Sequence, residues 1–185
     1  MSMSYAQMVT GCRRRNSDAW RALYDEFAPM AMGVCCRFSS CEDEARDLLQ
    51  DAFVKILENI GTLREPEKLR SWIYNIVVNT CIQNYRRNHR LTLKDDIDTI
   101  GADQGELLYS MDDIVDALQQ LPPAQRMAIN LCYIEELGQD EAARRMGCEY
   151  VTLRGILSKA RARMRLYLET KMKKRYNNGL EELSS

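Results

Sequence analysis

The chain has few of the residues that build metal sites and catalytic centres. It contains one histidine, His89, and its seven cysteines form no Cys-x-x-Cys pair, so a Cys/His zinc site has almost no ligands to draw on. Neither a GxxxxGK nor a GxGxxG phosphate-binding loop occurs, and the acidic residues have no evident partner base. We therefore expect no metal, no cofactor and no catalytic residue, which argues against an enzyme.

Helix breakers and long apolar runs are also scarce. Four prolines and nine glycines in 185 residues permit long helices and disfavour a turn-rich sheet protein. No segment approaches the ~20 apolar residues that span a bilayer, and the N-terminus lacks the apolar core of a signal peptide. Most cysteines lie among apolar residues, as small buried hydrophobes of a reducing compartment do. We expect a cytoplasmic protein with no direct membrane insertion.

Hydrophobic periodicity predicts an all-α fold with two small helical domains. The expected helices cover residues 4–12, 17–38, 42–60, 69–89, 111–120, 123–135, 139–146 and 149–172. Pro29 is expected to kink or break the second of them. Its helical period is given by apolar residues at three- and four-residue steps, namely Trp20, Leu23, Phe27, Ala31, Val34 and Phe38. The expected domains are a helical bundle over 1–90, a flexible acidic linker over 91–110, a helix-turn-helix domain over 111–172 and a fraying tail over 173–185.

Charge is unevenly distributed although the net charge is only −1. Residues 91–116 hold eight acidic residues and one lysine, a net charge of −7. Residues 154–175 hold nine basic residues and one glutamate, a net charge of +8. The basic segment suggests a polyanionic partner, and a solvated helix face is an equally good interpretation of the charge alone.

The helix expected over 42–60 has the clearest two-faced pattern. At about 100° per residue its apolar residues share one side, namely Ala45, Leu48, Leu49, Ala52, Phe53, Ile56 and Leu57. The opposite side carries Asp43, Glu44, Asp47, Gln50, Asp51 and Glu58 around the apolar Val54. Carboxylates repel phosphate, so this face suits water or a basic protein partner, and the pattern leaves both open.

The helix expected over 69–89 has an unusual polar face. Trp72 shares it with amides and arginines, namely Asn75, Asn79, Gln83, Arg86, Arg87 and Arg90, whereas Ile73, Ile76, Val77 and Cys81 are expected on the other side. Amides can read base edges, an aromatic ring can stack on a base, and arginines can hold phosphates. The face therefore suits unpaired bases, but a solvated amide face with Trp72 packed on the preceding loop is at least as well supported.

A helix-turn-helix is expected over residues 139–158. Gly147 is the natural stop of its first helix, because glycine reaches positive φ without a Cβ penalty, and Ala143 is small enough for a close helix crossing. The second helix presents polar and basic residues outward, namely Thr152, Arg154, Ser158, Lys159, Arg161 and Arg163. Such a helix fits a DNA major groove, and an ordinary helical hairpin is the alternative.

Together these segments resemble the extracytoplasmic-function (ECF) sigma factors of the sigma-70 family, and they follow the family's order. AWRALYDEF (19–27) looks like the opening helix of the family's N-terminal domain, and EARDLLQDAFVKIL (44–57) resembles its polymerase-binding helix. LRSWIYNIVVNTCIQNYRRNHR (69–90) is similar to the promoter-melting and -10 helix. Residues 118–165 resemble the domain that reads the -35 element, and the whole resemblance covers about residues 5–170.

The resemblance implies a bacterial sigma factor that binds core RNA polymerase, recognises promoter DNA and promotes its opening. Contacts with the β′ clamp helices and the β flap are implied, with polymerase-binding roles for Asp47, Gln50, Asp51 and Val54. Binding of the -10 element is implied for Ser71, Trp72, Asn75, Asn79, Gln83, Arg86, Arg87 and Arg90. Binding of the -35 element is expected for Thr152, Arg154, Ser158, Lys159 and Arg161. A cognate anti-sigma factor is a further implied partner.

Three positions depart from the family pattern and two other functions stay open. Leu69 replaces the usual Phe before Arg-x-Trp, and Gly155 and Ile156 stand where Ser and Arg are frequent. A helix-turn-helix regulator that acts without polymerase is one alternative, against which the motif at 44–57 argues. A helical adaptor that binds only protein is the other, against which the basic second helix of the motif argues.

Overall fold

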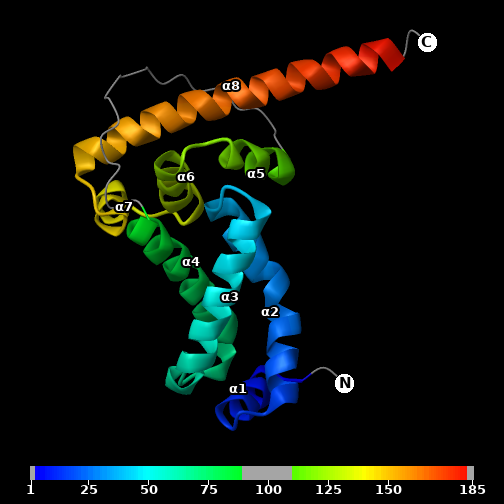
Figure 1. Cartoon of the computed structure of the whole chain (residues 1–185), viewed down its shortest axis with the longest axis vertical. Helices are drawn as coiled ribbons and strands as arrows, with labels where there is room; N and C mark the ends of the chain where they lie inside the picture. Colours follow the sequence, from blue (N-terminus) through cyan, green and yellow to red (C-terminus); the bar gives the residue numbers. More distant parts are fainter. Residues whose placement is uncertain (1–2, 89–109, 183–185) are drawn as a thin grey trace. The chain divides into compact units, whose positions relative to one another are not determined.

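The computed structural model describes residues 3–88 and 110–182, and every regular element in these two stretches is a helix (Figure 1). The chain divides into two compact units, one ending at Arg87 and the other beginning at Asn88. The expected all-α fold with two helical units is therefore confirmed. The expected linker lies outside the described residues except for Ser110, which caps the first helix of the second unit.

The N-terminal unit starts with two helices that approach closely, α1 (Tyr5–Arg13) and α2 (Ser17–Phe38). The Oδ1 atom of Asn16 accepts a hydrogen bond from the Ala19 N–H at 2.9 Å and thereby caps α2. A Cβ atom at Gly11 would lie only 2.4 Å from the Cβ of Ala19, so glycine is required where the two helices meet.

Helix α2 runs unbroken through Pro29, so the expected break at this residue does not occur. Pro29 and Asp25 are both exposed, and the Asp25 carbonyl that loses its helical partner can therefore bond to water. The buried side of α2 holds the helix together by packing, with Ala19, Leu23, Phe27, Ala31, Val34, Cys35 and Phe38 in the core.

Two further helices complete the N-terminal unit, α3 (Glu42–Asn59) and α4 (Leu69–Asn88), joined by 3-10 turns at Ile60–Thr62 and Pro66–Lys68. Both helices match the expected ranges to within one residue. Their buried side chains include Ala45, Leu48, Leu49, Ala52, Phe53 and Ile56 from α3 and Leu69, Ile73, Val77, Val78 and Cys81 from α4.

All seven cysteines are free, and they differ in exposure. Cys12, Cys35 and Cys81 are buried, as expected for small apolar residues, whereas Cys41 is exposed just before α3. Burial raises the pKa of four thiols above the ordinary value, those of Cys12, Cys36, Cys132 and Cys148.

Between Ser110 and Glu182, the described part of the C-terminal unit has four α-helices and one π-helical turn. They are α5 (Met111–Gln119), α6 (Pro123–Ile129), the turn at Asn130–Ile134, α7 (Gln139–Met146) and α8 (Tyr150–Glu182). The helix expected over 123–135 is thus α-helical only up to Ile129. The core of this unit contains Ala117, Leu118, Leu121, Met127, Ala128, Leu131, Ala142, Met146, Leu153, Leu157 and Ala160.

One buried arginine holds the end of α5. Arg126 is only 2% exposed, and its guanidinium donates to the carbonyls of Leu118 (2.8 Å), Gln119 (3.2 Å) and Leu121 (2.7 Å). The last carbonyls of a helix have no partner within the helix and carry its negative dipole end. Arg126 satisfies them from within the core, and nothing in the sequence pattern predicted this role.

Helix α8 is longer than expected. The predicted end near residue 172 is wrong, because α8 ends at Glu182. The extension is tied to the start of α5, because Lys171 Nζ lies 2.8 Å from Asp113 Oδ1 and Arg175 donates to both oxygens of Asp113 at 2.8 and 2.9 Å.

Candidate functional surfaces

Four residues predicted to bind polymerase form one exposed stripe on α3, named here the α3 stripe. Asp47, Gln50 and Asp51 are exposed, and Val54 is 55% exposed. Their steps of three, one and three residues keep them on one side of the helix. Neither carboxylate of the stripe pairs with another side chain in the described parts of the chain, so both charges face solvent.

The first turn of α3 is arranged differently. Arg46 donates to Glu42 at 2.5 Å and to Asp43 at 3.1 Å, and the carboxylate of Glu44 accepts from the Ser40 N–H at 2.6 Å. Acidic side chains at a helix N-terminus also complement its dipole. These acids therefore stabilise the helix locally, and the α3 stripe begins only after them.

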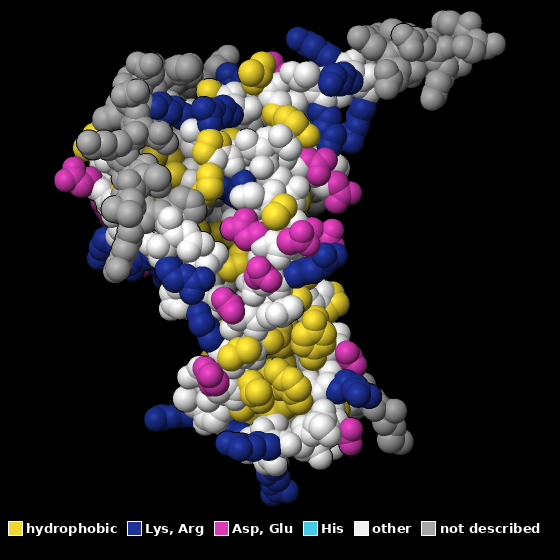
Figure 2. Space-filling view, viewed as in Figure 1, with side chains coloured by type: hydrophobic (Ala, Val, Ile, Leu, Met, Phe, Trp, Pro, Cys, Tyr) yellow, Lys and Arg dark blue, Asp and Glu magenta, His cyan; other side chains and the backbone are white. Residues whose placement is uncertain are grey.

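An exposed apolar patch adjoins the stripe. It consists of Trp20 and Tyr24 from α2 and Val54 and Leu57 from α3, and Figure 2 shows hydrophobic side chains gathered over these two helices. The Phe53 ring lies beneath, with its centroid 6.0 Å from Trp20 and 4.6 Å from Tyr24. Tyr24 is 42% and Leu57 44% exposed, which is unusual for large side chains on the core side of a helix pair.

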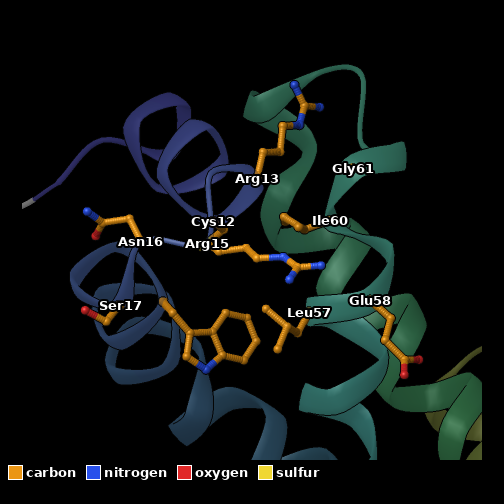
Figure 3. Close-up of a pocket in the computed structure, with 10 residues that line it drawn as sticks. Cys12, Arg13, Arg15, Asn16, Ser17, Leu57, Glu58, Ile60 and Gly61 are labelled. Atoms are coloured by element: carbon orange, nitrogen blue, oxygen red, sulfur yellow. The ribbon is translucent and has the colours of Figure 1, made fainter.

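Two residues of the apolar periodicities, Trp20 and Leu57, lie outside the core. Trp20 is half-buried and Leu57 exposed because both border a cavity of about 700 Å³ between the α1–α2 turn and the end of α3. Figure 3 shows the side chain of Arg15 extending toward the part of the cavity that Leu57 and Ile60 line. Arg15 has a φ of 57°, a backbone conformation that non-glycine residues rarely adopt.

The residues predicted for the -10 element share the outer side of α4, named here the α4 face. Trp72 is half-buried, and the other described members are exposed, namely Ser71, Asn75, Asn79, Gln83, Arg86 and Arg87. Ser71 lies at the edge of the face, where its hydroxyl donates to the Lys68 carbonyl at 3.0 Å. Arg90 lies outside the described residues.

A groove of about 280 Å³ between α3 and α4 runs along the α4 face. Lys55 reaches across it from α3, and its ammonium group lies 2.8 Å from Gln83 Oε1 and 3.3 Å from Thr80 Oγ1. Ile76, expected on the buried side, lines the groove together with Trp72. Sequence reasoning missed Lys55, although it is one of only two basic residues in α3 and directly follows Val54.

The helix-turn-helix is present as predicted. Gly147 adopts a φ of 76°, and its N–H bonds to the Arg144 carbonyl at 3.2 Å, while the Cys148 N–H bonds to the Ala143 carbonyl at 3.1 Å. This pair of bonds is a Schellman motif, which satisfies the carbonyls at the end of α7 and turns the chain sharply. Ala142, Ala143, Met146 and Leu153 are buried where α7 packs on α8.

Four of the five residues predicted for the -35 element lie along two edges of α8, and Ser158 lies between these edges. Counting about 100° per residue, Arg154 and Arg161 share one edge, and Thr152 and Lys159 share the other. Arg154 and Arg161 are exposed, whereas Thr152, Ser158 and Lys159 are half-buried. Arg161 donates to the Tyr133 hydroxyl at 3.2 Å and so is partly held by the unit itself.

Part of the basic segment of α8 is neutralised inside the C-terminal unit. Asp113 is only 4% exposed and binds Lys171, the Ser110 hydroxyl and Arg175, which together hold the pKa of its carboxyl well below the usual range. Lys171 also binds Asp116, and the two carboxylates raise the pKa of Lys171. These cations are consequently not free to bind a polyanion in the way that their sequence suggests.

No helix in the two described stretches is both long and apolar enough to cross a bilayer.

Two family models match the chain, Sigma-70 region 2 over residues 23–91 and Sigma-70 region 4 over residues 111–164. The RNA polymerase sigma factor SigV of Bacillus subtilis is 32% identical over 128 residues, which cover 69% of this chain and 77% of that protein. The ECF RNA polymerase sigma factor SigE of Mycolicibacterium smegmatis is 28% identical over 159 residues, which cover 81% of this chain and 62% of that protein.

Solved structures of sigma factors also resemble the chain. One is the sigma factor RpoE from Bartonella quintana in complex with the anti-sigma factor NepR, with 25% identity, coverage of 79% of this chain and 94% of that chain, and a TM-score of 0.47. The matched regions account for both helical units, in the family's order. The chain belongs to the extracytoplasmic-function group of the sigma-70 family and is an RNA polymerase sigma factor.

Proposed function

We propose that the N-terminal unit, residues 1–90, binds both core polymerase and the -10 strand, and that residues 111–172 read the -35 element. The observation that carries this proposal is the pair of exposed faces on adjacent helices, carboxylate-rich on α3 and rich in amides and arginines on α4. Carboxylates repel phosphates. A unit that binds core polymerase and DNA at the same time therefore needs separate acidic and basic surfaces.

The α3 stripe and the adjoining apolar patch form the proposed docking surface for the β′ clamp helices. Aromatic side chains often dominate the energy of a protein interface, and the docking surface contains two of them, the exposed Tyr24 and the half-buried Trp20. The carboxylates of Asp47 and Asp51 favour a basic partner and disfavour an acidic one. The β flap is the proposed second contact, with the C-terminal unit.

The α4 face binds the unpaired -10 strand. Opening DNA costs about 1.4 kcal/mol per base-pair step, and stacking of a base on an aromatic ring returns ~1–3 kcal/mol. Trp72 borders a groove of about 280 Å³ that also exposes the amides of Asn79 and Gln83. Arg86 and Arg87 continue the face toward the strand's phosphates. Capture of single-stranded bases therefore shifts the promoter toward the open state.

The helix-turn-helix places the first turns of α8 in the -35 major groove. Its proposed contacts are Thr152, Arg154, Ser158, Lys159 and Arg161, the two arginines and the lysine reaching phosphates or guanine edges. RNA synthesis belongs to the polymerase, so the factor has no catalytic residue of its own. It acts in the cytoplasm, and an anti-sigma factor is proposed as its regulator.

Binding to core polymerase is the first test. The Asp51→Arg variant should bind core enzyme at least tenfold more weakly, because it places a cation against a basic partner. Glu67→Arg is the matched control, since it makes the same charge change at an exposed position outside α3. Affinity is measured by fluorescence anisotropy of the labelled chain titrated with core polymerase. Equal affinities of the two variants would contradict the assignment of the α3 stripe.

Promoter opening is the second test. Holoenzyme is formed with core polymerase, and active promoters are found by run-off transcription from a library of bacterial genomic fragments. The Asn79→Ala variant should bind core normally and give less open complex, followed by the fluorescence of 2-aminopurine in the -10 element. Normal opening by variants of both Asn79 and Gln83 would contradict the role of the α4 face, and a holoenzyme without start-site selectivity would contradict the whole proposal.

A further inference from the structure

The outward line of α8 carries small and apolar residues rather than charged ones. Leu153, Leu157 and Ala160 are buried against the rest of the unit. At about 100° per residue the opposite side of the helix is occupied by Val151, Gly155 and, two turns later, Ala162. Four of the five polar residues proposed for the -35 element lie on the two edges that flank this line, and Ser158 lies beside Val151.

The side chain of Val151 is largely exposed to solvent. It is 66% exposed at the second residue of α8, in the part of a recognition helix that reaches base edges. A single exposed valine is ordinary on a protein surface. Here, however, it stands between Arg154 and Thr152, on the side of the helix that faces the bases once these edges hold the DNA.

Gly155 follows Val151 by one helical turn on the same line. Glycine inside a helix is less stable than alanine by about 1 kcal/mol, because it has more backbone freedom to lose. The absence of a side chain lets the backbone of α8 approach a groove floor more closely than any other residue would. The outward line of α8 therefore combines an apolar side chain, Val151, with a position at which the backbone can come close to DNA, Gly155.

We propose that Val151 and Gly155 determine part of the -35 base preference, with Val151 contacting the C5-methyl group of a thymine and Gly155 allowing α8 to come close enough. This inference rests on the proposed major-groove role of α8. The thymine methyl is the apolar group that the major groove displays, and apolar side chains contact it there. Arg154 and Lys159, on opposite edges, hold the phosphates that fix the register.

The experiment starts with holoenzyme and a promoter library randomised over the -35 region. Selection should enrich thymine at one position or more, and Val151→Ser should lose the preference at one of them only. Replacing that thymine by deoxyuridine removes its methyl group alone. We expect about fourfold weaker binding by the wild-type chain, from the burial of one methyl-sized group, and no further loss in Val151→Ser.

Gly155→Ala supplies a second, independent readout with effects of opposite sign. The variant should melt at a higher temperature than the wild-type chain, since alanine stabilises a helix interior, and yet bind the selected promoter more weakly. Retention of the thymine preference by Val151→Ser, no effect of deoxyuridine at any thymine, or unchanged promoter affinity of Gly155→Ala would each overturn the inference.

The Arg154→Ala variant distinguishes a failure of the methyl-contact inference from a failure of the proposed major-groove role of α8. Loss of promoter affinity in Arg154→Ala, together with any of the overturning results, would leave α8 in the major groove and reject only the methyl contact. Unchanged affinity in Arg154→Ala would remove α8 from the groove, and the inference about Val151 and Gly155 would fall with it.

Discussion

The two units use their charged side chains in opposite ways. In the N-terminal unit the carboxylates of Asp47 and Asp51 face solvent, and Lys55 joins α3 to α4 through its hydrogen bonds to Gln83 and Thr80. In the C-terminal unit Lys171 and Arg175 bind the buried Asp113, and Arg126 lies in the core. A run of charges in a sequence is therefore a binding surface only where the fold leaves the charges unpaired.

Loss of the Arg126 side chain should have the largest effect on stability. Arg126→Met removes the guanidinium that donates to three carbonyls at and just beyond the end of α5, of which that of Leu118 keeps the N–H of Leu121. We expect the C-terminal unit to lose about 3 kcal/mol. Both tryptophans, Trp20 and Trp72, lie in the N-terminal unit, so tryptophan fluorescence follows that unit and far-UV circular dichroism follows both. An equal shift of the two transitions would show that the units do not unfold separately. The exposed Arg154→Met is the control.

Removal of the Asp113 charge should have a smaller effect that depends on pH. Its pKa is lowered in the folded chain, so the stability it contributes is present above the unfolded value of about 3.9 and disappears as the pH falls through the folded value. Asp113→Asn should therefore be less stable than the wild-type chain at pH 7, and the difference should shrink toward pH 2. Thermal denaturation over this range measures both. A constant difference would contradict the ion pairs with Lys171 and Arg175.

Promoter affinity should distinguish free cations from paired ones. Arg154→Ala should weaken -35 binding by about 1–3 kcal/mol if it reads a base, or lower the salt slope of log K by about 1 if it holds a phosphate. Lys171→Ala should change neither quantity, because Asp113 and Asp116 already occupy its ammonium group. The affinity of each variant for promoter duplex is measured by titration at salt concentrations from about 50 to about 200 mM. A matching loss of slope in Lys171→Ala would contradict the division.

The smallest effect is expected at Lys55. Lys55→Met keeps the side-chain stem and removes the hydrogen bonds to Gln83 and Thr80, and we expect the N-terminal unit to lose about 0.5 kcal/mol. Tryptophan fluorescence during urea unfolding measures this loss. A loss above about 2 kcal/mol would show that these hydrogen bonds are shielded from water rather than solvated.

Much of the fold was predictable because periodicity reports the side of a helix that packs. The ranges of α2, α3, α4 and α7 follow from apolar spacing, capping and the stop at Gly147. The end of α8 was not predictable in this way, since the ion pairs that fix it join residues separated by 62 positions in the sequence. The π-helical turn after Ile129 was not predictable from apolar spacing either.

The candidate surfaces were predictable as lists of residues and less so as shapes. The sequence places the α3 stripe and the α4 face on the correct sides of their helices. It groups Trp20 and Leu57 with apolar residues that are buried, because periodicity carries no information about the cavity that both side chains border. It also misses Lys55, whose role depends on the distance between two helices.

The uneven exposure of the seven thiols makes this protein convenient for spectroscopy. Cys41 is the exposed one, and burial raises the pKa of Cys12, Cys36, Cys132 and Cys148, which leaves them with less of the thiolate that reacts with maleimides. A dye should therefore attach first at Cys41, one residue before α3 begins. Holoenzyme assembly can then be followed in the native chain, without engineered attachment sites.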